Sequence, residues 1–256
     1  MTTKPGSLHS RISSPPSRRH AFTLIETAIV IAVMATLATL LVPSGKWAKE
    51  RTQRALCREN LRRLGVAAHI YAEANRGHLF QRLRDDGVWI CWEVPAATFS
   101  QITNLAGERA IDCPNLYPFT MPGLIYDPGG RLDPRNCMLI GYNYCGAVAE
   151  TDMQRRFGWV SPVRTSDDPT LPLFVDANNC GYINGYWAVV PHAATGSLRI
   201  GGSAFVNLGA SMNPRDLGAE GGNIGTLDGS VRWKPIRQMK LDHWTFRDDF
   251  GDRGMW

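Results

Sequence analysis

The longest apolar stretch of the chain runs from Phe22 to Val42 and is 21 residues long. A helix of about 20 apolar residues is what the roughly 30 Å hydrocarbon core of a bilayer requires, so residues 22–42 are predicted to span a membrane. The single ionisable side chain in this stretch is Glu26. Because a charge in a bilayer costs about 2.5–3.5 kcal/mol on insertion scales, such a residue is expected to have a partner or a function.

A different pattern begins after Pro43. Apolar side chains recur on one face at helical spacing, and the positions between them are rich in arginine; the apolar positions are Cys57, Leu61, Leu64, Ala68 and Tyr71. Because this spacing starts so soon after Pro43, the proline indicates a kink in one long helix rather than its end. Residues 43–76 are therefore predicted to form an amphipathic second half of the helix, and Gly77 is predicted to cap it.

The remainder, residues 77–256, has short apolar runs separated by frequent glycine and proline. Short strands are predicted at Val88–Trp92, Leu171–Asp176 and Tyr186–Val190. Within Ile224–Trp233 the dipeptide Asp228-Gly229 separates two strand-like runs, which is the signal for a hairpin with a type I′ turn. The predicted fold class is α+β, with a long N-terminal helix packed on a small antiparallel sheet.

The residues around the start of the apolar run form a motif. Arg18-Arg19-His20-Ala21 precedes it, and the run opens with Phe-Thr-Leu-Ile-Glu. This order resembles the class III signal of type IV pilins and type II secretion pseudopilins. In that family a membrane-embedded prepilin peptidase cuts after the small residue and methylates the new N-terminal Phe. The resemblance implies cleavage between Ala21 and Phe22, N-methylation of Phe22, and a cytoplasmic leader of residues 1–21.

The same resemblance implies roles for two further residues. Glu26 would pair with the N-terminal ammonium of a neighbouring subunit during filament assembly, and Pro43 would be the helix-bending proline of pilins. The chain departs from the family at Ala21, where Gly is usual. A secretory signal peptide and an uncleaved anchor stay open as alternatives for the segment, although signal peptides have a shorter apolar core of about 7–15 residues.

A second resemblance covers the other end of the chain. Several short motifs are similar to those of pseudopilin-like proteins that abound in planctomycetes and end in an Asp-Gly hairpin: Ile111-Asp112-Cys113-Pro114, Gly141-Tyr142-Asn143, Leu173-Phe174-Val175-Asp176, and the segment Gly222 to Val231. His192 lies much farther upstream of Asp228 than the histidine of that group does, so the resemblance assigns it no role.

The net charge of +5 comes mainly from the N-terminus. Residues 1–21 hold four basic residues and no acids, which leaves 24 basic and 23 acidic residues, or +1, for the remainder. A basic leader before an apolar helix indicates orientation with the leader in the cytoplasm, not a nucleic-acid surface.

Six cysteines follow the apolar run, at Cys57, Cys91, Cys113, Cys137, Cys145 and Cys180. An even number in an exported domain permits disulfides, and a link from Cys113 to Cys137 or Cys145 is the favoured local bridge. Free buried thiols are the alternative. Since no CxxC pair occurs and no histidine stands at zinc-ligand spacing from a cysteine, a structural zinc site is not expected.

No catalytic residues are predicted, because the chain has no GxSxG, HExxH or P-loop motif. Asp228 and Gly229 are interpreted as turn residues. No metal or cofactor is expected, with one exception: Asp248, Asp249 and Asp252 are candidates for a calcium site in the tail, since calcium takes several oxygen ligands from flexible loops. The alternative for these acids is a solvated tail.

The resulting hypothesis is a non-enzymatic pilin-like subunit of the bacterial inner membrane. It would cross the membrane once and place residues 77–256 in the periplasm or outside the cell. Its partners would be the prepilin peptidase, other pseudopilins or pilins, and an inner-membrane assembly platform, in a type II secretion or type IV pilus-like fibre. The alternative is a membrane-anchored exported binding domain that does not polymerise.

Overall fold

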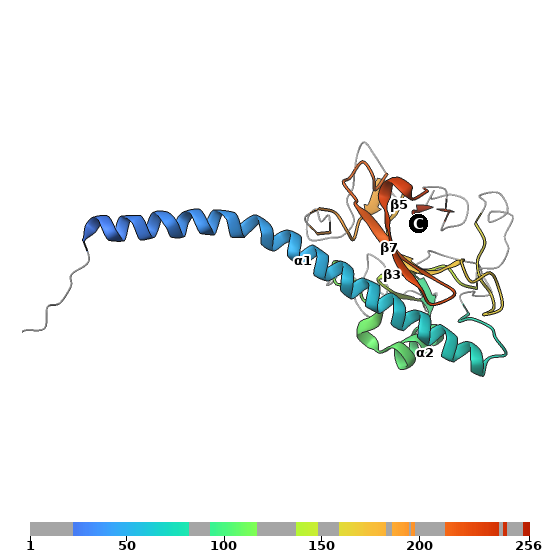
Figure 1. Cartoon of the computed structure of the whole chain (residues 1–256). Helices are drawn as coiled ribbons and strands as arrows, with labels where there is room; N and C mark the ends of the chain where they lie inside the picture. Colours follow the sequence, from blue (N-terminus) through green and yellow to red (C-terminus); the bar gives the residue numbers. More distant parts are fainter. Residues whose placement is uncertain are drawn as a thin grey trace, which may run out of the picture. The chain divides into compact units, whose positions relative to one another are not determined.

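The computed structural model describes residues 23–81, 93–116, 137–147, 159–182, 186–194, 196–197, 213–240, 243–244 and 253–256. Within helices and strands, some side chains, including those of residues 39–46, are outside this description. The chain divides into two compact units, residues 1–43 and residues 44–256. The fold is α+β, as predicted: an N-terminal helix is followed by shorter helices and small antiparallel sheets (Figure 1).

Helix α1, Leu24–Ala74, is 51 residues long and continues through Pro43. A bend at Pro43 stays a prediction, because nothing in the structure tests it. At the C-terminal end the Gly77 N–H donates to the Ala72 carbonyl at 2.8 Å. Both Arg76 (φ 57°) and Gly77 (φ 80°) are left-handed, so the predicted cap includes the residue before the glycine as well.

In the part of the chain that the structure describes, two four-stranded antiparallel sheets and one strand pair follow α1. The first sheet has the order β3-β4-β7-β8, formed by Tyr142–Tyr144, Pro172–Asp176, Gly221–Thr226 and Val231–Pro235. The second has the order β6-β5-β10-β9, formed by Tyr186–Val189, Asn179–Tyr182, Arg253–Gly254 and His243–Trp244. The pair consists of β1, Glu93–Pro95, and β2, Cys137–Leu139. The short helices are α2, Ala96–Ala106, η1, Glu108–Ile111, and η2, Ile236–Gln238.

The main core lies between the second half of α1 and the sheet that contains β4 and β7. Four of the five apolar positions predicted from helical spacing, Cys57, Leu61, Leu64 and Ala68, are fully buried, and Tyr71 is partly buried against them. They pack with sheet and loop residues such as Phe174 and Leu227. The predicted buried face of α1 is therefore confirmed.

The strands predicted at Leu171–Asp176 and Tyr186–Val190 are present as β4 and β6, within one residue at an end. The strand predicted at Val88–Trp92 lies outside the described residues.

The hairpin predicted around Asp228 is formed by β7 and β8, but its turn differs from the prediction. The Gly229 N–H donates to the Thr226 carbonyl at 3.0 Å, and the Thr226 N–H donates to the Ser230 carbonyl at 2.9 Å. This is a three-residue loop in which Gly229 is left-handed, with φ 80°. A type I′ turn needs positive φ at both central positions, and Asp228 is not among the described non-glycine residues with positive φ.

The predicted bridge between Cys113 and Cys145 is wrong, since both side chains are buried and neither is in a disulfide. Successive residues of a strand point to opposite faces, so Tyr144 joins the core beneath α1 while Cys145, directly after β3, joins a separate cluster with Trp159 and Trp256. Cys113 instead contacts Cys57, with 3.4 Å between the sulfur atoms. The side chain of Cys137 is among those that the structure does not describe, so its predicted link to Cys113 stays a prediction.

Candidate functional site

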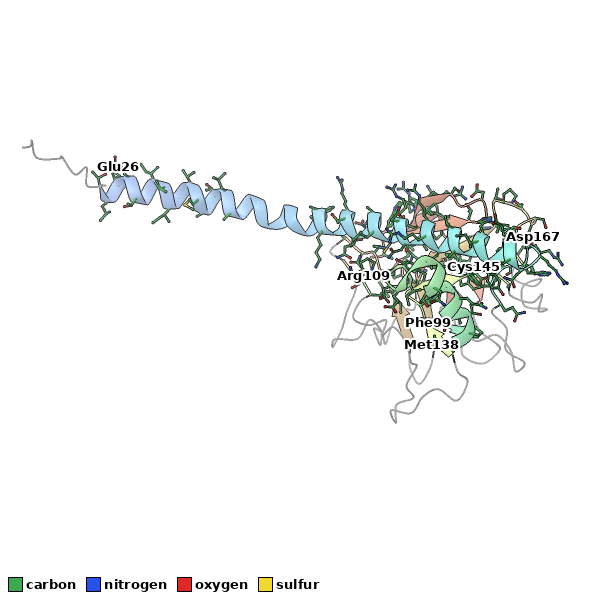
Figure 2. The ribbon with its side chains drawn as sticks, turned by 90° about the horizontal axis from the view of Figure 1, so that it is seen from below. Glu26, Phe99, Arg109, Met138, Cys145 and Asp167 are labelled. Atoms are coloured by element: carbon green, nitrogen blue, oxygen red, sulfur yellow. The ribbon has the colours of Figure 1, made fainter. Side chains whose placement is uncertain are left out.

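The first turn of α1 is closed by reciprocal hydrogen bonds between Thr23 and Glu26 (Figure 2 labels Glu26). The Thr23 N–H and hydroxyl each donate to Glu26 Oε2 at 2.8 Å, and the Glu26 N–H donates to Thr23 Oγ1 at 3.3 Å. This is a capping box, in which residues at N-cap and N3 satisfy each other's free N–H groups. Its signal, Thr-x-x-Glu before an apolar run, is present in the sequence and could have predicted it.

The capping box gives the Glu26 carboxylate partners within its own chain. The positive end of the helix dipole also favours a negative charge at this position. Two threonine hydroxyls further along the helix also find acceptors in their own chain. Thr27 donates to the Leu24 carbonyl at 2.9 Å, and Thr36 donates to the Val33 carbonyl at 2.8 Å. These hydroxyls therefore need no water, which suits an apolar environment.

Large apolar side chains cover the described part of this helix half and are more than half exposed. They are Leu24, Ile25, Ile29, Val30, Ile31, Val33, Met34 and Leu37. A continuous apolar surface of this kind marks a site of contact with another molecule or with lipid. Over the side chains that the structure describes, no helix meets the combined length and hydropathy requirement for crossing a membrane.

Several predicted site residues lie outside the described part of the chain. Ala21 and Phe22 precede it, so cleavage and N-methylation stay predictions. The calcium candidates Asp248, Asp249 and Asp252 are also outside it.

The second half of α1 carries a buried polar network that no sequence pattern predicted. Glu50 accepts a hydrogen bond from Arg54 Nε at 2.9 Å and one from Asn115 Nδ2 at 2.8 Å, and its Oε1 lies 2.8 Å from His192 Nδ1. Arg54 also pairs with Glu220 and lies over the ring of Trp233. Burial raises the pKa of Glu50, but the hydrogen bonds from His192, Arg54 and Asn115 outweigh it and lower that pKa. The network ties one turn of α1 to loops far away in the sequence.

Comparison with known protein families gives a match at the N-terminus. Residues 16–42 fit the family model of the prokaryotic N-terminal methylation motif. No curated protein and no solved structure matches the chain. The matched residues include the basic residues before Ala21, the whole capping box and the exposed apolar half of α1. The chain thus carries a prepilin-type N-terminal methylation motif, which is consistent with the type IV pilin-like and pseudopilin family.

Proposed function

We propose that this chain is the precursor of a non-enzymatic pilin-like subunit. A prepilin peptidase cuts it between Ala21 and Phe22 and methylates Phe22. The first half of α1 then inserts in the inner membrane, with the leader in the cytoplasm and residues 77–256 on the other side. The observation that carries the proposal is the methylation motif at residues 16–42, since it coincides with a helix whose apolar side chains are exposed.

Assembly would use the exposed apolar side chains between Leu24 and Leu37. In a fibre these side chains pack against the same surface of neighbouring subunits, which removes them from lipid or water without any covalent chemistry. The fibre serves a type II secretion or type IV pilus-like machine. The partners are the prepilin peptidase, sibling pseudopilins or pilins, and an inner-membrane assembly platform.

Glu26 has two candidate roles in this scheme. In the described chain it caps its own helix through Thr23. Cleavage before Phe22 creates a terminal ammonium near this first turn, and the pilin role of Glu26 is to pair with the ammonium of a neighbouring subunit. We propose that the intermolecular pair is the role needed for assembly, and that the capping box holds the carboxylate at the helix start until the pair forms.

Intact-mass spectrometry of the membrane-extracted protein, with N-terminal sequencing, tests the processing step. A chain that begins at Phe22 and carries one added methyl group is the expected product. A chain that keeps its original N-terminus would overturn the processing step and favour an anchored domain that does not polymerise.

Substitutions of Glu26 separate the two roles. Glu26→Gln keeps an oxygen that can accept the Thr23 hydrogen bonds but removes the charge, whereas Glu26→Val removes both. If the ion pair drives assembly, both variants insert into the membrane and both fail to enter filaments, as measured by sedimentation of sheared fibres. If Glu26→Gln assembles and Glu26→Val does not, the carboxylate acts only as a helix cap. Normal assembly of both variants would contradict any role for Glu26 in the fibre.

A further inference from the structure

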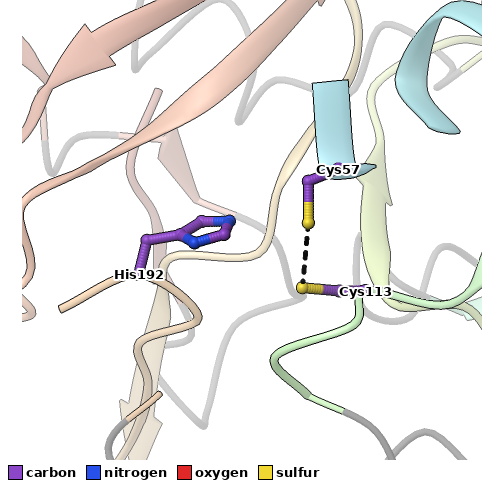
Figure 3. Close-up of side chains that lie close together, drawn as sticks. All are labelled: Cys57, Cys113 and His192. Atoms are coloured by element: carbon purple, nitrogen blue, oxygen red, sulfur yellow. Dashed lines mark hydrogen bonds between the residues drawn. The ribbon is translucent and has the colours of Figure 1, made fainter. Parts of the chain in front are cut away.

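Three side chains with metal-binding atoms meet beneath α1 (Figure 3). Cys57 comes from α1, Cys113 follows η1, and His192 lies in the loop after β6. One ligand atom from each residue lies within 4.8 Å of the other two, and all three residues are fully buried. The cluster is separate from the methylation motif and is not used by the proposed assembly.

The ligand atoms of this cluster and the spacing between them suit a zinc ion. Thiolate sulfur and imidazole nitrogen are the ligands that zinc prefers in structural sites. The two sulfur atoms are 3.4 Å apart. Two thiolates bound tetrahedrally to one zinc ion at about 2.3 Å each would lie about 3.8 Å apart, so a small adjustment brings both into contact with the ion.

The imidazole ring of His192 is oriented as in known zinc sites. Its Nδ1 lies 2.8 Å from Glu50 Oε1, so a proton on Nδ1 is held by the carboxylate and Nε2 is left with its lone pair. Nε2 is buried and has no hydrogen-bond partner. Metal-bound histidines characteristically donate their other ring N–H to a carboxylate, which fixes the tautomer and the ring orientation.

Asp176, at the end of β4, places a buried carboxylate next to His192. Its Oδ2 accepts hydrogen bonds from the backbone N–H of Asn223 at 2.6 Å and from Asn223 Nδ2 at 3.0 Å, and it lies 3.3 Å from His192 Nε2. Its Oδ1 is buried and has no hydrogen-bond partner. An unpaired carboxylate oxygen in a protein interior is costly unless a cation or a donor satisfies it.

We propose that Cys57, Cys113 and His192 bind a zinc ion, with Asp176 as the fourth ligand. The ion would connect α1 to the loop after η1, the loop after β6 and strand β4. Binding releases the protons of the two thiols, and the resulting thiolates balance the charge of the ion. The site is structural, since four protein ligands leave no open position for a substrate.

Two metal-free arrangements compete with this proposal. In one, the thiols stay protonated and His192 is an imidazolium between two acids. Burial raises the pKa of Cys57 well above its usual value. Burial lowers the pKa of His192, but the nearby Asp176 and Glu50 outweigh it and raise that pKa to about 10. In the other arrangement, Cys57 and Cys113 are oxidised to a disulfide during export.

Metal analysis of the full-length protein, extracted in detergent and purified without chelator, distinguishes these cases. We expect one zinc per chain by elemental mass spectrometry. Cys57→Ser and Cys113→Ser should each lose the zinc, whereas Cys145→Ser, which alters an equally buried cysteine in another cluster, should keep it. Zinc that survives in both Cys57→Ser and Cys113→Ser would place the ion elsewhere and overturn the proposal.

Measurements on the wild-type chain test the zinc site even if the cysteine variants fail to fold. Wild-type protein stripped of zinc and refilled with Co²⁺ should show thiolate-to-cobalt charge transfer together with the visible bands of tetrahedral Co²⁺. Metal-free protein whose thiols are alkylated only after unfolding would support the imidazolium arrangement and overturn the zinc site. A mass lower by two hydrogen atoms, with Cys57 and Cys113 in one cross-linked peptide, would overturn it in favour of the disulfide.

Discussion

Asp228 shows how a single side chain sets a turn. Its Oδ1 accepts the Thr226 hydroxyl at 2.6 Å and the Ser230 N–H at 2.9 Å. These contacts favour a loop in which only Gly229 is left-handed, because an Asp that bonds the backbone two residues on forms its own local turn. The Asp-Gly signal therefore predicted the position of the hairpin but not its turn type.

Asp228→Ala should lower the free energy of unfolding by about 1 kcal/mol, since it removes two hydrogen bonds at a surface turn. Asp228→Asn keeps an acceptor oxygen and is the control, with a smaller loss expected. Urea unfolding followed by tryptophan fluorescence gives both values. Equal stability of Asp228→Ala and wild type would show that the hydrogen bonds add nothing beyond what water provides.

The effect of Asp228→Ala should also depend on pH. The hydrogen bonds from Thr226 and Ser230 lower the pKa of Asp228 below its ordinary value. A lowered folded-state pKa means that the carboxylate stabilises the fold above the unfolded-state pKa, near about 4, and that this contribution fades as the pH falls through the folded-state pKa. The stability difference between wild type and Asp228→Ala should therefore be full at neutral pH and shrink in acid. A difference that stays constant down to acid pH would contradict a role for the charged form.

The sequence patterns predicted contacts between neighbouring residues better than contacts between residues that are far apart in the sequence. The capping box of Thr23 and Glu26 lies within four consecutive residues, so the sequence alone could have predicted it. The Cys57–Cys113 contact joins residues 56 positions apart, and His192 comes from a third segment. Spacing rules for zinc motifs detect ligands that share a loop or a hairpin, so they do not detect a cluster assembled only when a helix packs on loops.

The second half of α1 is an element whose buried face was predictable from its spacing. Leu64 is fully buried on that face, and Val66, two residues later, is 57% exposed. Leu64→Ala should lower the free energy of unfolding by about 3 kcal/mol, because it removes buried methyl groups and leaves a cavity. Val66→Ala is the matched control and should change stability by no more than about 0.5 kcal/mol. Chemical denaturation of the two variants checks the contrast, and similar losses for both would mean that α1 does not pack on the sheet through this face.

The strands divide according to how strongly their sequences are patterned. Strand β4 contains a run of apolar residues around Phe174, and the β7–β8 hairpin has a turn signal, so both were predicted. Strands β9 and β10 have two residues each and show no alternation. Strand β10 pairs with both β9 and β5. These pairings depend on tertiary contacts, because two residues carry too little pattern to specify a strand.

At the scale of the whole molecule, α1 belongs to both compact units. Its residues up to Pro43 lie in the first unit, and its residues from Ser44 lie in the second. The network of Glu50, the buried face around Leu64 and the proposed zinc ligand Cys57 all lie in the second unit. The methylation motif ends at residue 42, so the features that suggest assembly are confined to the first unit.

This division predicts that the second unit folds without the first. A chain starting at Ser44 keeps all the buried contacts named above, and serine is a favoured residue at a helix N-cap. We expect it to be monomeric in detergent-free buffer and to unfold in one cooperative thermal transition. A chain starting at Phe22 is the control: it lacks only the leader, keeps the exposed apolar side chains from Leu24 to Leu37, and should need detergent. Aggregation or non-cooperative unfolding of the shorter chain would mean that the first half of α1 helps to hold the domain together, and detergent-free solubility of the longer chain would argue against both the membrane anchor and the fibre.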